Sequence, residues 1–166
     1  TGLTITGGQT TGSGGGILVG EEALTLVDCV VADNSATVVG GGIHVQSTGA
    51  GTLASLTLRN TSITGNSGQR GGGFYMFDGG SALIEASTIS GNSASAQGGA
   101  FYFYGQVTAG GLIVRNSTIA NNTAGDTGGG IILRGSTSAG TLVLQNSTIT
   151  GNSAANTGGG IYRLNN

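Results

Sequence analysis

A glycine triplet recurs along this chain at a nearly constant interval, and it limits the possible folds more than any other feature. Successive triplets lie 26, 31, 27, 30 and 30 residues apart, and each opens a short apolar run. The six triplets begin at Gly14, Gly40, Gly71, Gly98 (where the triplet reads Gly-Gly-Ala), Gly128 and Gly158. Repeats of about 20–50 residues are typical of solenoids and propellers, in which each unit buries its apolar face against the next.

A second motif, of the form Asn-Ser-Thr-Ile-Thr-Gly-Asn, precedes five of the six triplets. It is clearest at 60–66, 116–122 and 146–152 and more degenerate at 28–34 and 86–92. Its last residue lies 5 or 6 residues before the next triplet, whereas the segment after the apolar run varies in length. These last residues are predicted to form a turn ladder with amide hydrogen bonds from coil to coil. They are Asn34, Asn66, Asn92, Asn122 and Asn152.

Each repeat holds three short segments with the alternation of a β-strand, as at 131–134, 142–145 and 147–150. Their β-branched residues and the glycine at each junction argue against helix. Strands this short cannot bury a core alone, but coiling pairs each one with its equivalent about 4.8 Å along the axis. The sequence therefore predicts an all-β parallel β-helix of about six coils, with three strands per coil, as one domain over residues 1–166.

Stacked coils would place three apolar columns inside the solenoid. The first contains Ile17, Ile43, Phe74, Phe101, Ile131 and Ile161, accompanied by Val19, Val45, Met76, Phe103 and Leu133. The second contains Leu26, Leu58, Ile84, Val114 and Leu144, and the third contains Ile5, Val31, Ile63, Ile89, Ile119 and Ile149. Cys29 aligns with a column of small residues, Thr61, Ser87, Ser117 and Ser147, and is predicted to be a buried thiol.

The composition argues against several classes of partner and cofactor. Only 7% of residues are charged, and five arginines spread over the chain give no basic footprint for nucleic acid. No apolar run approaches the roughly 20 residues of a membrane-spanning helix. A single cysteine excludes an internal disulfide and a cysteine-based zinc site. We therefore expect no nucleic acid, no membrane-spanning segment and no cofactor.

The paired signatures resemble a known family of repeats. The segments Gly98-Gly99-Ala100 and Ile149-Thr150-Gly151-Asn152 are similar to the repeats of polymorphic outer membrane proteins and related right-handed β-helix surface proteins. The resemblance covers nearly the whole chain. It implies a right-handed coil, an extracellular or cell-surface location, and a passenger segment of a large secreted or autotransported protein, often adhesive.

The charged residues give little sign of catalysis. Glycoside hydrolysis requires two carboxylates about 5–10 Å apart, but Glu85 aligns with Arg59 and Arg115 on the neighbouring coils. This arrangement predicts a structural Arg–Glu–Arg ladder on the surface. His44, the only histidine, has no acidic partner in its own strand and is expected at the surface. A carbohydrate-active enzyme is therefore the third hypothesis, and we expect no enzymatic activity.

Two outward faces remain as candidate binding surfaces. Aromatic residues of the third strand alternate outward on adjacent coils, and exposed aromatic clusters usually mark contact surfaces. The candidate binding residues are Tyr75, Phe77, Tyr102, Tyr104 and Arg134, and Tyr162 and His44 extend the same face. A long segment such as 104–111 could instead fold over them. The variable segments 46–55, 104–111 and 134–140 are further candidates for display.

The second strand presents the other face, which carries no charge. Seven of its twelve outward positions are threonine: Thr4, Thr6, Thr64, Thr88, Thr118, Thr148 and Thr150. A flat Thr-x-Thr array resembles the surface of ice-binding proteins, although threonine is ordinary on exposed strands. Ice binding is therefore the alternative hypothesis.

The first hypothesis is a non-catalytic structural or adhesive segment that displays the aromatic face and loops to a glycan or protein of the cell surface. Neither end of the chain shows an obvious cap, and a solenoid requires capped ends. We therefore also expect that further coils, a capping domain or another subunit stack end to end with this segment.

Overall fold

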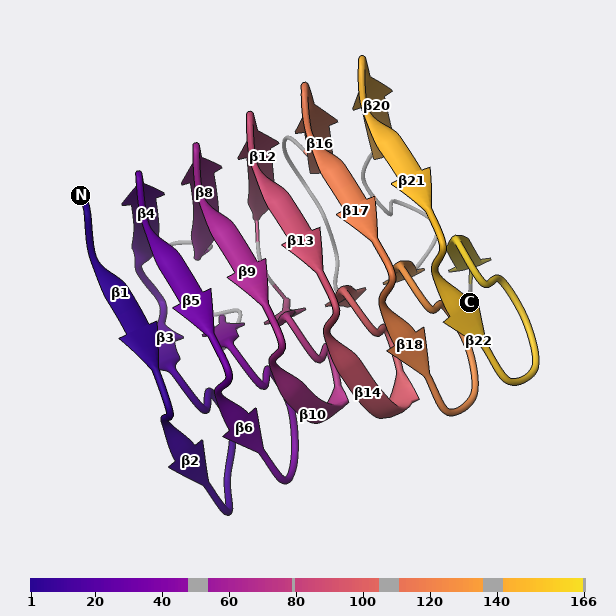
Figure 1. Ribbon diagram of the computed structural model, residues 1–166, viewed down its shortest axis with the longest axis horizontal. Coiled ribbons are helices and arrows are strands. Elements are labelled where there is room, and N and C mark those ends of the chain that lie inside the picture. The colour runs from indigo at the N-terminus through magenta and orange to yellow at the C-terminus, as the bar shows by residue number, and fades with distance from the viewer. Residues whose placement is uncertain (48–53, 79, 105–110, 136–141, 166) are drawn as a thin grey trace.

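The computed structural model describes residues 1–47, 54–78, 80–104, 111–135 and 142–165, and within these ranges every regular element is a β-strand. The strands pair in parallel and form four sheets, each of which runs along the rod, and the coils follow one another from the N-terminal to the C-terminal end (Figure 1). The chain visits the sheets in the same order in each coil. The predicted all-β parallel β-helix is therefore confirmed.

Sheets A and C carry most of the predicted strand segments. Sheet A consists of β1 (Thr4–Thr6), β5 (Val30–Ala32), β9 (Ser62–Thr64), β13 (Thr88–Ser90), β17 (Thr118–Ala120) and β21 (Thr148–Thr150). Sheet C consists of β3 (Ile17–Gly20), β7 (Ile43–Gln46), β11 (Phe74–Phe77), β15 (Phe101–Tyr104), β19 (Ile131–Gly135) and β23 (Ile161–Asn165).

Sheet D precedes sheet A in each coil, and sheet B follows sheet A. Sheet D consists of β4 (Ala23–Val27), β8 (Ser55–Arg59), β12 (Ser81–Glu85), β16 (Gly111–Arg115) and β20 (Leu142–Gln145). Sheet B consists of β2 (Gln9–Thr10), β6 (Ser35–Ala36), β10 (Ser67–Arg70), β14 (Ser93–Gln97), β18 (Thr123–Ala124) and β22 (Ser153–Ala154). Six strands in three sheets and five in the fourth, within the described residues, agree with the predicted number of repeats.

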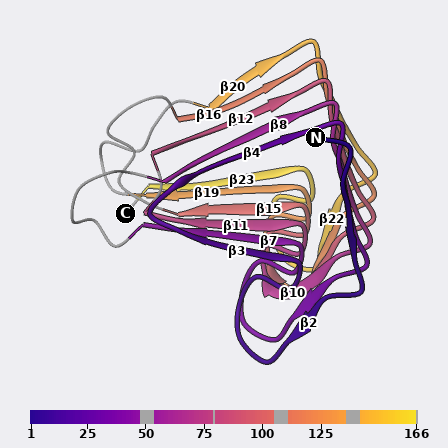
Figure 2. The same ribbon diagram turned by 90° about the vertical axis from the view of Figure 1, so that its left-hand side faces the viewer.

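Sheet B corrects the prediction of three strands per coil. Several of its strands have only two residues, such as β6 and β18, and they consist of serine, threonine and alanine. No hydrophobic alternation can appear over so short a polar segment. Viewed along the rod, sheets D, A and C enclose the interior, while sheet B and its connection to sheet C form a lobe on the outer side of sheet C (Figure 2). We call this segment of each coil the outer lobe.

The predicted inward columns form the core, except in the C-terminal coil, where Leu144 is 40% and Ile161 36% exposed. In sheet A the register pairs Val31, Ile63, Ile89 and Ile119, all of which are 0% exposed. In sheet C the rings of Phe74 and Phe101 stack 4.6 Å apart. Because identical positions repeat at every coil, like side chains pack on like along the whole rod.

The predicted asparagine ladder runs along the corner between sheets A and B. The Nδ2 of each of the first four asparagines donates to Oδ1 of the asparagine one coil further on, at 2.8–3.0 Å. It also donates to a sheet A carbonyl of the preceding coil, as from Asn92 to Ile63 at 2.9 Å. Each Oδ1 accepts a backbone N–H as well, as from Asn66 to Asn92 at 3.0 Å. The buried amides are therefore satisfied from both sides, as burial of polar groups requires.

The glycine triplet meets a steric requirement where the outer lobe joins sheet C. Its first residue has a left-handed backbone, as at Gly71 with φ 62°. Its second residue packs backbone against backbone, so a Cβ on Gly72 would lie 2.6 Å from the carbonyl oxygen of Gly99. No side chain fits there, which explains why the triplet recurs in each coil.

We predict that Asn92→Ala lowers the free energy of unfolding by about 2–4 kcal/mol. The substitution leaves the buried N–H of Asn66 and the carbonyl of Ile63 without these partners, and each such loss costs about 1–3 kcal/mol. Urea denaturation followed by circular dichroism measures the change. The exposed amide of Gln145 is the control, and Gln145→Ala should shift the midpoint little. Equal shifts for the two variants would show that the ladder is not a major source of stability.

Candidate functional site

The predicted aromatic face consists of two rows of side chains, here called files, which run along the rod on the outer side of sheet C. The first file contains Tyr75 and Tyr102, and the second contains Phe77 and Tyr104. Tyr75 pairs in register with Tyr102, and Phe77 pairs with Tyr104. The ring centroids are 5.1 Å apart in the first pair and 5.2 Å in the second. The intervening residues of these strands point into the core, so the predicted outward direction is correct.

Exposure of the first file differs from the prediction. Tyr75 is 7% exposed and Tyr102 only 3%, so neither offers an open contact surface. They pack with Val39 and Ile132 in a second apolar cluster. Val39 belongs to the outer lobe, which turns back across this side of sheet C (Figure 2). A cover was anticipated from the segment 104–111, but the covering element described by the structure is the outer lobe.

His44 belongs to the same file and is also buried, which corrects its expected place at the surface. Its side chain packs edge-on against Tyr75 with ring centroids 5.5 Å apart, and the residue is 6% exposed. Its Nδ1 has no hydrogen-bond partner among the described residues. Burial lowers the pKa of His44 and raises the pKa of Tyr75 to about 12, because desolvation disfavours both charged forms.

The second file stays partly exposed and forms what we call the aromatic edge, made of Phe77, Tyr104 and Arg134. The guanidinium carbon of Arg134 lies 5.9 Å from the ring centroid of Tyr104, within the range of a cation–π contact. A hydrogen bond with Tyr102 raises the pKa of Arg134. In the sequence, Tyr104 and Arg134 stand at the start of variable segments, and residues 48–53, 105–110 and 136–141 of the variable segments lie outside the described residues.

The outward side chains of sheet A form the threonine face. Thr4, Thr6, Thr88, Thr148 and Thr150 are exposed. Thr64 and Thr118 are half-buried, and the other outward positions hold serine, alanine or valine. The strands pair in uniform register, so these side chains repeat along the rod at the coil spacing. The predicted regular and uncharged array is present, although Val30 and Ala32 replace both threonines in one coil, and Ser62, Ser90 and Ala120 each replace one in the next three coils.

The family model described as "Right handed beta helix region" matches residues 1–166. The chain belongs to the right-handed β-helix family. A search of curated proteins and a search of solved structures returned no match.

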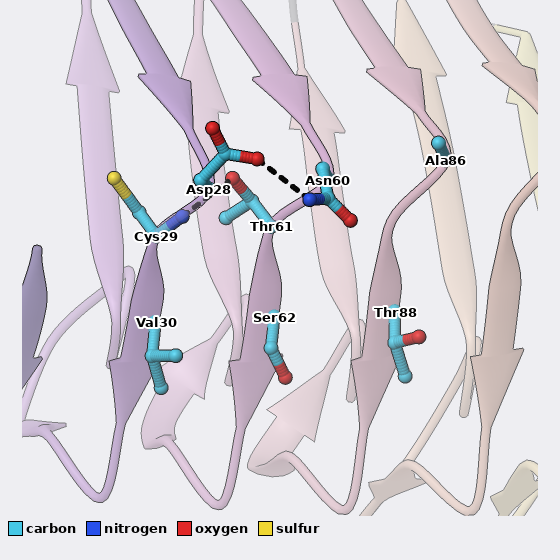
Figure 3. Close-up of a pocket in the computed structure, with 8 residues that line it drawn as sticks. All are labelled: Asp28, Cys29, Val30, Asn60, Thr61, Ser62, Ala86 and Thr88. Carbon is cyan, nitrogen blue, oxygen red and sulfur yellow. Dashed lines mark hydrogen bonds between the residues drawn. The ribbon is translucent and has the colours of Figure 1, made fainter. Parts of the chain in front are cut away.

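A groove of about 260 Å³ follows the corner between sheets D and A of this β-helix (Figure 3). Asn60 Nδ2 donates to Asp28 Oδ1 at 2.6 Å across adjacent coils. Both residues have a left-handed backbone, as does Ala86 in the next coil, where the polar column is interrupted. The groove offers one carboxylate, and no group of three metal-ligating side chains occurs in the described part of the chain.

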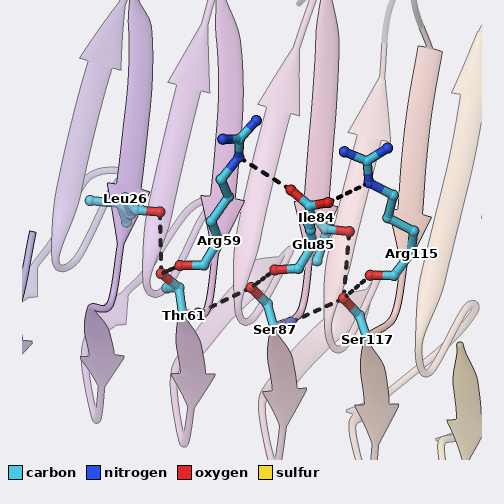
Figure 4. A network of polar contacts seen from close by, with 8 residues as sticks. All are labelled: Leu26, Arg59, Thr61, Ile84, Glu85, Ser87, Arg115 and Ser117. Atoms are coloured by element: carbon cyan, nitrogen blue, oxygen red, sulfur yellow. Dashed lines mark hydrogen bonds and ion pairs between the residues drawn. The ribbon is translucent and has the colours of Figure 1, made fainter.

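Two polar ladders occupy the same corner (Figure 4). Glu85 Oε2 lies 3.3 Å from Arg59 Nε and its Oε1 lies 2.7 Å from Arg115 Nε, as the predicted Arg–Glu–Arg ladder requires. The second ladder is the small-residue column, in which each backbone N–H donates to the hydroxyl one coil on, as from Thr61 to Ser87 at 3.1 Å. Cys29 is 2% exposed at the start of this column, which confirms the predicted buried thiol. Among the described residues there is no helix that could cross a membrane.

We predict that His44 makes this β-helix less stable as the pH falls from about 7 to 5. The unfolded histidine has a pKa near 6.5 and the folded one a lower pKa, so in this window the unfolded chain binds more protons and is favoured. Thermal melts at several pH values measure the loss. His44→Phe keeps a ring against Tyr75 and should flatten the dependence between pH 7 and 5. An identical pH profile in the variant would contradict this assignment.

Proposed function

We propose that this β-helix is a non-catalytic structural segment of an extracellular or cell-surface protein. It acts as a rigid rod that presents a contact surface to a glycan or a protein. The similarity of its motifs to polymorphic outer membrane protein repeats supports a role as a passenger segment. On this proposal the end-to-end partners are further coils of the same architecture.

The observation that carries the proposal is the use of polar side chains along the rod. The asparagine amides of the ladder, the hydroxyls of the small-residue column and the Glu85 carboxylate are engaged between neighbouring coils. A buried ladder with every amide satisfied resists bending, because each bend would break hydrogen bonds in a low-dielectric interior. A rigid rod whose ladder side chains are already bonded to one another suits display better than catalysis.

The aromatic edge is the part of the predicted aromatic face that suits contact. Tyr75 and Tyr102 are buried under the outer lobe, whereas Phe77, Tyr104 and Arg134 keep part of their surface free. Aromatic and arginine side chains are the residues most enriched in binding hot spots. The contact therefore centres on this edge.

We predict that Phe77→Ala with Tyr104→Ala lowers adhesion of the chain to glycan- and protein-coated surfaces by about tenfold, the effect of losing about 1.4 kcal/mol. Beads that carry the purified chain are counted on each surface after washing. Thr25→Ala, on the exposed side of sheet D, is the control and should adhere like the original chain. Adhesion that survives the double substitution would place the contact elsewhere.

Ice binding is a second candidate, and the uniform register of the threonine face favours it. Its methyl and hydroxyl groups repeat without an intervening charge, so a lattice of water could match them over several coils. The interruption at Val30 and Ala32 and the half-buried Thr118 reduce the regular area. These interruptions favour the display function over ice binding.

For this candidate we predict that Thr88→Lys abolishes thermal hysteresis and ice shaping. A long charged side chain at the centre of sheet A would hold ice away from the rest of the face. Thr25→Lys adds the same charge on sheet D and should leave both effects intact. Absence of thermal hysteresis in the unmodified chain would eliminate ice binding.

A further inference from the structure

The first file of sheet C, which contains Tyr75 and Tyr102, has isoleucine in place of tyrosine in one coil and tyrosine again in the next. Tyr102, Ile132 and Tyr162 are successive partners in register. The smaller Ile132 leaves a slot between two tyrosines that are two coils apart, about 10 Å by strand spacing. A pocket of about 180 Å³ occupies this place, between sheet C and the outer lobe.

The floor of the pocket contains a buried polar atom without a partner. Tyr102, Thr127 and Ile132 are 3%, 9% and 2% exposed, and all three line the pocket. Thr127 Oγ1 has no hydrogen-bond partner among the described residues. Buried hydroxyls are nearly always bonded, because leaving one unpaired costs about 1–3 kcal/mol. The floor therefore offers an unused hydrogen-bonding group to whatever enters.

The rim of the pocket carries one cation and one anion. Arg134 Nε has no partner, and within the described ranges no carboxylate lies within ion-pair distance of this guanidinium. Asp126 belongs to the outer lobe, where its carboxylate accepts bonds from Gln97 Nε2 at 3.2 Å and Asn156 Nδ2 at 2.7 Å. The rim thus offers a guanidinium to an anion and a fixed carboxylate to hydrogen-bond donors.

We propose that this pocket binds one acidic monosaccharide unit, a sugar ring that carries a carboxylate. The ring enters the slot left by Ile132 between Tyr102 and Tyr162, and its carboxylate pairs with the fork of Arg134. Its hydroxyls donate to Asp126 and bond with Thr127 Oγ1. The inference rests on the proposed contact with glycans and names the sugar class at one position on the rod.

Other small anions satisfy the pocket less well. A phosphate dianion would bring two negative charges beside Asp126, which an acidic sugar with a single charge avoids. An aromatic carboxylate could enter the slot and reach Arg134, but it has no hydroxyl for Asp126 or Thr127. A neutral sugar would leave the guanidinium without an anion.

Titration of the chain followed by NMR tests the proposal directly. The probes are methyl glucuronide and N-acetylneuraminic acid, with methyl glucoside and benzoate as comparisons. We expect at least one acidic sugar to bind in the millimolar range, and the glucoside and benzoate to bind at least about tenfold more weakly. Equal affinity for the glucoside, equal affinity for benzoate, or no binding of either acidic sugar would overturn the proposal. If one of the two acidic sugars binds more tightly, that preference supports the proposal and shows whether the pocket takes a uronic acid or a sialic acid.

Three variants locate the site. Ile132→Tyr fills the slot and should abolish binding, while the chain stays folded because Tyr75, Tyr102 and Tyr162 already pack over the equivalent glycines. Arg134→Gln should weaken acidic sugars at least about tenfold and reduce their advantage over the glucoside. Thr25→Ala lies on sheet D, outside the pocket, and should leave the affinity unchanged.

Unchanged binding in a folded Ile132→Tyr chain would overturn the proposal. If that variant fails to fold, unchanged binding in Arg134→Gln would overturn it instead. The two proposals can fail separately. Bead adhesion without binding of any acidic sugar removes only the pocket, whereas acidic-sugar binding without bead adhesion removes only the display function.

Discussion

The hydrogen bond between neighbouring asparagine amides is the interaction on which the rest of this structure depends. It fixes the position of one residue per coil at the corner between sheets A and B, and thereby the register of every strand that follows. A shift of one residue would turn an entire strand inside out. With the amide in place, the isoleucines of sheet A fall on one another, and Ile63, Ile89 and Ile119 are fully buried. The same register aligns the small-residue column and the Arg–Glu–Arg ladder without further adjustment.

The glycine triplet complements the ladder, because it allows the chain to turn back from sheet B to sheet C. After sheet B the backbone must double back against the neighbouring coil, and Gly72 packs there on the carbonyl of Gly99. The outer lobe created by this return covers one file of sheet C. A requirement of backbone packing therefore decides which aromatic residues are buried and which remain available.

The inward columns could be predicted from the sequence, because alternation within strands and a constant repeat determine which side chains meet. The burial of Tyr75 and His44 could not. Alternation tells whether a side chain points away from the core. The cover comes from a different segment, whose own strands hold no large apolar residue and so show no hydrophobic periodicity. The pocket beside Ile132 could not be predicted from the sequence for the same reason. The exchange of tyrosine for isoleucine is visible in the sequence, whereas the approach of Thr127 and Asp126 depends on the course of the outer lobe.

The two ladders also give the rod a polarity. Asn34, Asn66, Asn92 and Asn122 each donate one side-chain N–H to the amide oxygen of the next coil, and the backbone N–H groups of the small-residue column donate in the same sense. The amide dipoles therefore point the same way and add along the axis, unlike those of sheet backbones, which nearly cancel. A coil joined in the opposite orientation would set donor against donor or acceptor against acceptor. Growth or fusion of such a rod is thus directional, because the C-terminal coil of one rod matches only the N-terminal coil of the next.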